Sequence, residues 1–344
     1  MAKILPADTL DNPTNQSRNC FLICSHAGSQ LIGHAHGILI EMPDCPPAWR
    51  ILQFFTNEEN MAEYRREDLA SWNDFVAAVN RLQVDTRTRR ARLPGTIIPD
   101  LLFRGHREAD WTLDTTLERA KPSSLSLAHY YTAISAALPQ VEAHTQEKWE
   151  INPVHAYRDM ARKASADLYF RAHFPAYDYM CYLRHHGFPS PLLDWTRSPY
   201  VAAFFAFRDK GTPDGRVAIF VYRETEGGGK TGSGMGTPRI QVRGPYVRTH
   251  RRHFVQQCQY TVCMEYKKIG ALPEWHYASH EAVFSTQLGL MMTGQDQIWK
   301  FTIPRSERQS VLAYLDEHNL NAYSLFGSDE SLMEMMTHRE LLSR

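Results

Sequence analysis

The sequence predicts an α+β fold in which helices flank a central mixed β-sheet, with a small β-containing segment at the N-terminus. Helical patterns gather in the first half of the chain, over 71–83, 123–149 and 153–183. Strand patterns gather later, over 216–224, 254–264 and 296–304. This order is typical of α+β proteins rather than of a strict alternation of strands and helices. Because the chain has 344 residues, 43% of them hydrophobic, it can bury a large core.

The chain is expected to divide near residue 65. Residues 1–18 are polar, and we expect them to be disordered. The stretch "CFLICSHAGSQLIGHAHGILIEM" (20–42) predicts β-structure around an Ala-Gly-Ser-Gln turn. Its cysteines and histidines fit no zinc-site spacing, so no metal site is expected there. We therefore expect a disordered start and a small β-containing appendage over 1–65, and the main domain over 66–344.

The main domain is expected to begin with an amphipathic helix. "SWNDFVAAVNRLQ" (71–83) carries apolar residues at helical spacing, and Ser71 can cap it. "VDTRTRRARLPG" (84–95) is interpreted as a basic loop, whose arginines either face solvent or contact phosphate. "IIPDLLFRG" (97–105) then predicts a buried strand that delivers Arg104 at its end.

The last part of the chain combines strands with two helices. "SERQSVLAYLDEHN" (306–319) predicts a helix, and "AYSLFGSD" (322–329) is interpreted as a strand that leads into a final helix. "EGGGKTGSGMG" (226–236) fails the phosphate-loop motif, because Glu224 stands where a glycine is required and no helix follows. We expect a flexible surface loop there, with a lid over a ligand as the alternative.

Bulk composition excludes several classes of protein. Lys plus Arg and Asp plus Glu both number 38, so no global field draws the chain to nucleic acid or to anionic lipid. The N-terminus has no apolar signal region, and no run approaches 18 apolar residues, so we expect a cytoplasmic protein without membrane contact. Six cysteines in so long a chain indicate reduced thiols rather than a disulfide framework.

The stretch "HHGFPSPLLDWTRSP" (185–199) has the strongest functional pattern. Ser198 and Pro199 are suited to start a helix over the apolar run that follows, and a buried helix start suits an anionic ligand. Asp194, Trp195 and Thr196 stand directly before it, where they can face the same ligand. The alternative is structural, with the Asp194 and Thr196 side chains bonded to local backbone and Trp195 packed in the core.

These blocks together resemble the FRG domain, a family named for a Phe-Arg-Gly motif. That motif is Phe103-Arg104-Gly105 here, and "SWNDF" (71–75) precedes it. The second family block appears as "HHGFPSPLLDWT" (185–196). The third appears as "RHFVQQCQY" (252–260), with Cys258 where the family usually has glycine. The tail from "IPRSERQ" onward also follows the family pattern, so the resemblance covers about 70–340.

The resemblance implies an ADP-ribosyltransferase-like layout with NAD as the substrate. In that layout Arg104 and Gly105 hold the NAD phosphates, since a guanidinium fork suits pyrophosphate. Asp194 and Thr196 would hold the ribose, and the cofactor-binding set is completed by Trp195 and Ser198.

By the same resemblance, either Gln257 or Glu265 would lie near the reacting C1′ atom of NAD. The catalytic acid of such enzymes has no counterpart in the third block. A glutamine cannot act as a base, so proton removal would fall to His185, His186 or Asp194.

Three functions are therefore open. The first is transfer of ADP-ribose to a protein or nucleic-acid acceptor, in a toxin or phage-defence effector. The second is a non-catalytic nucleotide or nucleic-acid binding module, for which the missing acid would be natural. The third is a metal-dependent nuclease built on His185, His186 and Asp194. Arginines at 87–92, 248, 251 and 252 are either contacts for nucleic-acid phosphates or a solvated face.

Overall fold

The computed structural model describes residues 30–34, 37–41, 64–120, 125–212, 214–226, 230, 235–244, 247, 251–285 and 294–342. The chain divides into two units, 1–60 and 61–344. In the first, β1 (Gln30–His34) and β2 (Gly37–Glu41) form an antiparallel hairpin within the stretch predicted as β-structure, but Gln30, expected in the turn, lies in β1. The expected disorder over 1–18 and the cysteines of this unit lie outside the described residues.

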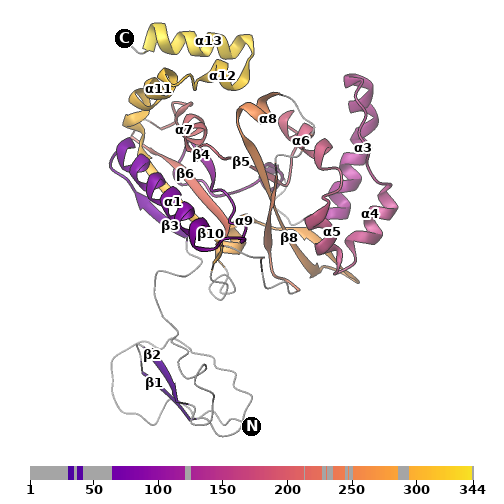
Figure 1. Ribbon diagram of the computed structural model, residues 1–344. Coiled ribbons are helices and arrows are strands. Elements are labelled where there is room, and N and C mark those ends of the chain that lie inside the picture. Colours follow the sequence, from indigo (N-terminus) through magenta and orange to yellow (C-terminus); the bar gives the residue numbers. More distant parts are fainter. Residues whose placement is uncertain are drawn as a thin grey trace. The chain divides into compact units, whose positions relative to one another are not determined.

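The second unit is built on an eight-stranded mixed sheet (Figure 1), which confirms the predicted fold class. Its order is β3 (Tyr64–Asp68), β10 (Gln295–Pro304), β6 (Arg216–Thr225), β4 (Leu102–His106), β5 (Leu192–Thr196), β8 (Cys258–Lys268) and β7 (Arg239–Arg243). A further strand, β9 (Pro273–Tyr277), pairs with β8. The β3–β10 pair is parallel and the other pairs are antiparallel.

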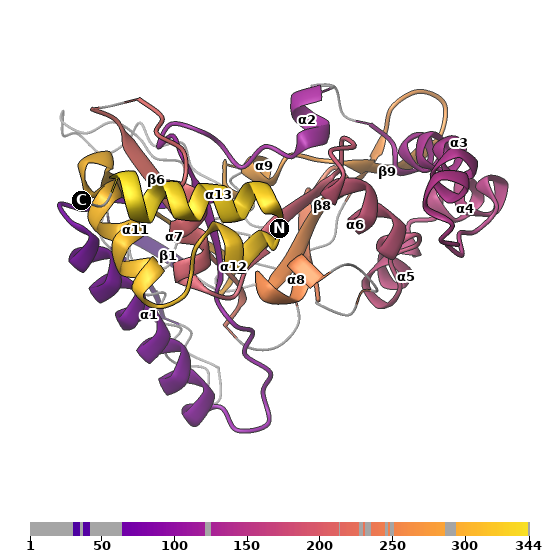
Figure 2. The ribbon, with the colours of Figure 1, turned by 90° about the horizontal axis from the view of Figure 1, so that it is seen from above.

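Two separate groups of helices cover the sheet. The β6–β4–β10 region packs against α1 (Trp72–Arg92), α7 (Pro199–Phe207), α11 (Arg308–Glu317) and α12 (Ala322–Phe326). Beside β8 and β9 lie α3 (Leu127–Thr145), α4 (Val154–Ala161), α5 (Ala166–Ala172) and α6 (Tyr177–His185), as Figures 1 and 2 show. Each group has its own apolar core. A third core, which includes Leu102 and Phe220 as well as Trp195 and Cys263, joins the two parts of the sheet.

Shorter elements complete the unit. They are α2 (Thr116–Ala120), α8 (Arg251–Val255), α9 (His280–Ser285), a 3-10 turn (Arg305–Glu307), α13 (Asp329–Thr337) and a final π-helical turn (His338–Leu342). None of the helices among the described residues is long and apolar enough to cross a membrane.

The segment 84–95, expected to be a basic loop, is mostly helical. Helix α1 begins at its Ser71 cap, as predicted, and continues to Arg92. An ion pair between Asp85 and Arg89, one turn apart, stabilises the helical turns beyond the predicted end at residue 83. Arg223 from β6 reaches Asp85 and the hydroxyl of Thr86, which ties these turns to the sheet.

Three other element predictions were wrong in detail. The region 153–183 is divided among α4, α5 and α6 rather than one long helix. Residues 254–264 begin inside α8, and the strand starts only at Cys258. "AYSLFGSD" forms α12 instead of a strand, because Asn321 and Ser324 make a capping box and Gly327 ends the helix in a left-handed conformation.

The Phe-Arg-Gly motif forms most of β4, where alternation sorts its side chains between the two faces of the sheet. Phe103 is buried in the core with α7. Gly105 faces the same helix, and a Cβ atom there would overlap the carbonyl oxygen of Ala202 and lie 2.7 Å from the backbone nitrogen of Ala206. The glycine therefore lets α7 pack directly on β4, while Arg104 points to the opposite face.

Replacing this glycine should weaken the fold. We expect Gly105→Ala to lower the free energy of unfolding by about 1–3 kcal/mol, because a rigid backbone cannot yield to the added methyl group. Urea denaturation of the full chain measures the change. An unaltered midpoint would show that α7 does not pack on β4 as closely as described.

Candidate functional site

Strands β4 and β5 are neighbours in the sheet but pair at a single position, Phe103 with Thr196. Beyond that pair the strands separate, and a cavity of about 740 Å³ opens between them. Its wall combines residues of β4 and β5 with the end of α6, α7, α8 and the segment 107–119. The two parts of the sheet, each with its own helices, thus meet at a hollow rather than along a continuous ladder.

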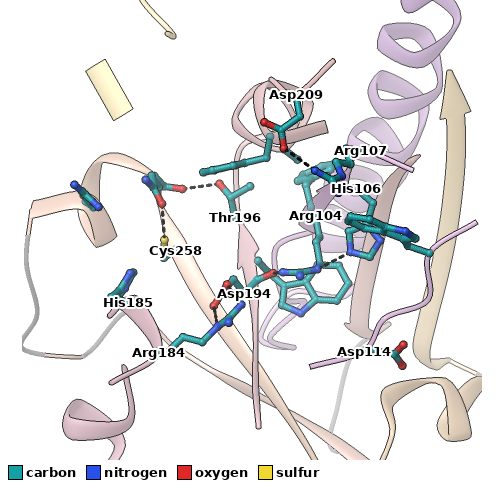
Figure 3. A pocket seen from close by; sticks show the side chains of 18 of the residues that line it. Arg104, His106, Arg107, Asp114, Arg184, His185, Asp194, Thr196, Asp209 and Cys258 are labelled. Carbon is teal, nitrogen blue, oxygen red and sulfur yellow. Dashed lines mark hydrogen bonds and ion pairs between the residues drawn. The ribbon is translucent and has the colours of Figure 1, made fainter. Parts of the chain in front are cut away.

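Arg104 crosses this gap (Figure 3). Its Nη1 donates to the backbone oxygen of Asp194 at 2.7 Å, and its Nε donates to Nε2 of His106 at 2.9 Å. Burial lowers the pKa of Arg104 to about 10, partly opposed by the Asp194 charge, so the guanidinium stays charged at neutral pH. Burial, together with the Arg104 charge, holds the pKa of His106 well below its usual range, so this ring is neutral and able to accept. None of the described residues accepts a hydrogen bond from Nη2.

Arg184 binds the Asp194 carboxylate from the end of α6. Its Nε lies 3.1 Å from Oδ1 and its Nη2 lies 2.5 Å from Oδ2, while Nη1 donates to the Thr116 hydroxyl at 3.0 Å. Burial raises the pKa of Asp194, but the charges of Arg184 and Arg104 outweigh it and lower the pKa below its usual range. Asp194 is therefore a bound carboxylate that fixes Arg184, and it is a weak base at neutral pH.

The two adjacent histidines lie in different surroundings. His185 lines the cavity, and its Nε2 lies 2.8 Å from the hydroxyl of Tyr260 on β8. Burial raises the pKa of Tyr260, so that hydroxyl keeps its proton. His186 ends α6, is exposed, and packs on Tyr182 with ring centroids 4.3 Å apart, outside the cavity lining.

Thr196, Trp195 and Ser198 have structural partners. The Thr196 hydroxyl donates to the backbone oxygen of Gln256 at 2.7 Å and accepts from the Ser198 nitrogen at 3.0 Å. Trp195 is buried, and its Nε1 donates to Thr261 at 2.8 Å. Ser198 caps α7, with Pro199 in its first turn, as predicted. Thr196 and Trp195 line the cavity, but their polar atoms are already bonded.

The third block needs a correction. Gln257, expected near the reacting atom, is exposed, has a left-handed φ of 50° and lies outside this cavity. Gln256 lines the cavity instead, and its Nε2 donates to the Leu325 backbone oxygen at 3.1 Å. Glu265 is seven residues beyond Cys258 on β8, about 23 Å away along an extended strand, and pairs with Lys267. Neither predicted replacement for the catalytic acid reaches the site.

Several lining residues were not predicted from the sequence. Arg107 lies 4.9 Å from the Trp111 ring centroid and 3.5 Å from Asp209, and Arg119 donates to the Asp114 backbone oxygen. These residues follow β4 in an irregular stretch that leads into α2, and their spacing in the sequence has no recognisable pattern. Arg184 could have been chosen as a candidate from the sequence, because it directly precedes the histidine pair at the end of a helix.

Comparison with known proteins identifies part of the chain. Residues 99–215 match the family model of the FRG domain. This segment is an FRG domain. The match contains the Phe-Arg-Gly motif and the 185–196 block, whereas the third block lies beyond it. No curated protein and no solved structure matches the chain. Among the described residues, no three His, Cys, Asp or Glu side chains are grouped to hold a metal ion.

Breaking the Arg184–Asp194 pair should change how the stability of the FRG domain depends on pH. Because the pKa of Asp194 is lowered in the fold, the carboxylate contributes stability that is present above its unfolded pKa and lost as pH falls below it. We expect Arg184→Gln to lower the free energy of unfolding by about 1–3 kcal/mol at pH 7. The loss should shrink as pH falls through the folded pKa of Asp194, which lies below its ordinary value, because the carboxylate is then protonated.

Urea denaturation at pH 7 and at a series of lower pH values measures this difference. Arg158→Gln is the matched control, because Arg158 is exposed and bonds only the Thr132 hydroxyl among the described residues. An equal effect of both variants at pH 7 would contradict the assigned ion pair.

Proposed function

We propose that the FRG domain binds NAD in the cavity between β4 and β5 and transfers its ADP-ribose to a protein or nucleic-acid acceptor. The observation that supports this most directly is Arg104. Its guanidinium is fixed from two sides by Asp194 and His106, and Nη2 is left for a ligand in the cavity. A charged, planar donor held in place before the ligand arrives suits a pyrophosphate.

The rest of the cavity fits the same ligand. Its volume of about 740 Å³ lies within the range of small-molecule and cofactor sites, about 300–1,000 Å³. Arg107, Arg119 and Arg252 bring further positive charge to the lining, which also contains the carboxylates of Asp110, Asp114 and Asp209. Trp111 and Phe205 offer flat apolar surfaces to a base or to nicotinamide. The cavity thus combines phosphate-binding and ring-binding chemistry in one place.

The proposed reaction breaks the bond between ribose C1′ and the nicotinamide nitrogen, and nicotinamide leaves with the bonding electrons. A nucleophilic atom of the acceptor bonds to C1′ and releases a proton. The domain would contribute mainly orientation and electrostatic stabilisation. We assign the proton to His185, since it lines both this cavity and a neighbouring groove through which an acceptor can approach.

A non-catalytic nucleotide-binding module is the second candidate. It is favoured by two features of the cavity: Asp194 is bound by Arg184, and the described lining residues include no glutamate, their other carboxylates being Asp110, Asp114 and Asp209. The two candidates share the Arg104 site and differ in turnover. Saturable NAD binding without loss of NAD and without label transfer would favour the module.

Arg104 should control NAD binding. We expect Arg104→Ala to weaken NAD binding by about 10- to 150-fold, the effect of losing one charged hydrogen-bonding group, and to abolish label transfer. Arg104→Lys keeps the charge without the fork and should recover only part of the binding. Isothermal titration calorimetry measures binding, and labelled NAD with a cell extract measures transfer.

The control is Arg158→Ala on α4, outside the cavity lining. NAD binding that is equally tight in Arg104→Ala and in the unaltered chain would refute the proposed clamp, whatever the result for transfer.

The histidine pair supplies a matched test of the proton acceptor. We expect His185→Gln to lower the rate of ADP-ribose transfer by about 10²- to 10⁴-fold, the usual contribution of a general base. His186→Gln, one residue away but outside this cavity, should change it by less than about tenfold. Single-turnover rates at saturating NAD make the comparison, and equal losses in the two variants would contradict the role of His185.

A further inference from the structure

A second and larger hollow adjoins the proposed NAD cavity. This groove, of about 1,610 Å³, is lined by the ends of α3 and α6 and by α8 and α12. Figures 1 and 2 both place α8 next to α6 and α12. His185, Arg252 and Phe326 line the groove and the cavity alike, so the two hollows share a wall.

Aromatic rings lie along the groove. Trp149 and Tyr182 have ring centroids 4.8 Å apart, and the His186 ring packs on Tyr182 at 4.3 Å. On the α12 side, Tyr323 keeps 47% of its surface exposed. Exposed or half-buried rings in a groove are stacking surfaces for unpaired bases, which every base can use irrespective of sequence.

Positive charge follows the same path. Arg251 and Arg252 line the groove, and Gln257 belongs both to it and to a smaller hollow of about 390 Å³ at the C-terminal end of α1. Three more arginines line that hollow, namely Arg87, Arg90 and Arg197. Arg87 and Arg251 donate no hydrogen bond to a described residue.

Few carboxylates oppose this charge. The acidic residues that line the two hollows are Glu147 and Asp100. Asp100 is already paired with Arg90 at 2.7 Å and with Arg197 at 3.5 Å. The path from α12 across α8 to the end of α1 is therefore basic, although the whole chain has a net charge of zero.

We propose that this path binds single-stranded nucleic acid, with bases stacked in the groove and phosphates on Arg251 and Arg87. Basic residues interleaved with accessible rings favour a single strand over a duplex, whose bases are already stacked. The assignment of the strand as acceptor rests on the proposed function. In that step a base nitrogen would bond to ribose C1′ as nicotinamide leaves, and its proton would pass to His185.

Binding is tested without NAD. The full chain is titrated into fluorescein-labelled RNA and DNA strands of about 20 nucleotides, and into the corresponding duplex, with anisotropy as the readout. We expect single strands to bind more tightly than the duplex. The double variant Arg87→Glu/Arg251→Glu should weaken single-strand binding by about tenfold or more and reduce the salt dependence, by about 0.7 in the logarithmic slope for each lost phosphate contact.

The matched control for charge is Arg81→Glu, an exposed arginine of α1 outside the lining of these hollows, and it should leave binding unchanged. Tyr323→Ala should weaken binding by about fivefold or more, whereas Tyr323→Phe, which keeps the ring, should not. Calorimetric NAD binding and thermal melting of each variant show that the fold and the cavity are retained.

Wild-type protein that binds no single strand, or binds the duplex more tightly, overturns this inference. Label transfer to protein without oligonucleotide binding also overturns it and leaves the proposed transferase intact. Oligonucleotide binding that depends on Arg87, Arg251 and Tyr323, in a protein that does not consume NAD, supports the groove and counts against the transferase.

Discussion

The candidate site depends on the incomplete pairing of β4 with β5. A single backbone pair joins β4 to β5, and the two parts of the sheet otherwise meet through a shared apolar core that includes Leu102 and Trp195. Arg104 adds a polar link to this core, since it bonds the Asp194 backbone across the gap. A buried arginine in that position requires compensation, and Asp194 and the neutral His106 ring provide it, whereas Arg184 is a like charge that Asp194 neutralises. The same contacts that hold the sheet together therefore create the charge distribution of the cavity.

Each residue of the Phe-Arg-Gly motif has a separate physical task. Phe103 fixes β4 in the core, and Gly105 removes the side chain that would hold α7 away from it. Arg104 faces the other way and carries the chemistry. Three consecutive residues on one strand can serve both the core and the cavity because successive side chains face opposite sides of the sheet. The residues that pack β4 thus alternate with the residue that faces the cavity. A shift of the strand by one residue would exchange the two faces and disrupt both.

Patterns local in the sequence predicted the local features of the fold. Ser71 and Ser198 were predicted as helix caps because the cap and the apolar positions it precedes are adjacent in sequence. The end of α1 was missed because its support comes from Arg223, far along the chain. The helix over 322–326 was missed because an apolar run of that length has no period of its own, and its capping box decides the outcome.

For the candidate site, too, the sequence predicted the residues in distinctive local blocks and missed those that depend on contacts distant in the chain. Arg104, His185 and Asp194 were found because their blocks have distinctive residues, and the structure places all three on one cavity. Gln256 and Gln257 are indistinguishable by type, and only the left-handed turn at Gln257 decides which of them faces inward. The partner of Asp194 was not found, since nothing in the spacing of Arg184 and Asp194 reveals that α6 returns to the end of β5.

The shared wall between the cavity and the groove has a thermodynamic consequence. His185, Arg252 and Phe326 contribute surface to both hollows, so any occupant that shifts one of these side chains alters both binding free energies. Linkage makes such an effect reciprocal: the factor by which one ligand changes the affinity for the other must equal the factor in the opposite direction. Cooperativity or competition between the two occupants would then need no movement of the domain, because three side chains are enough to connect them.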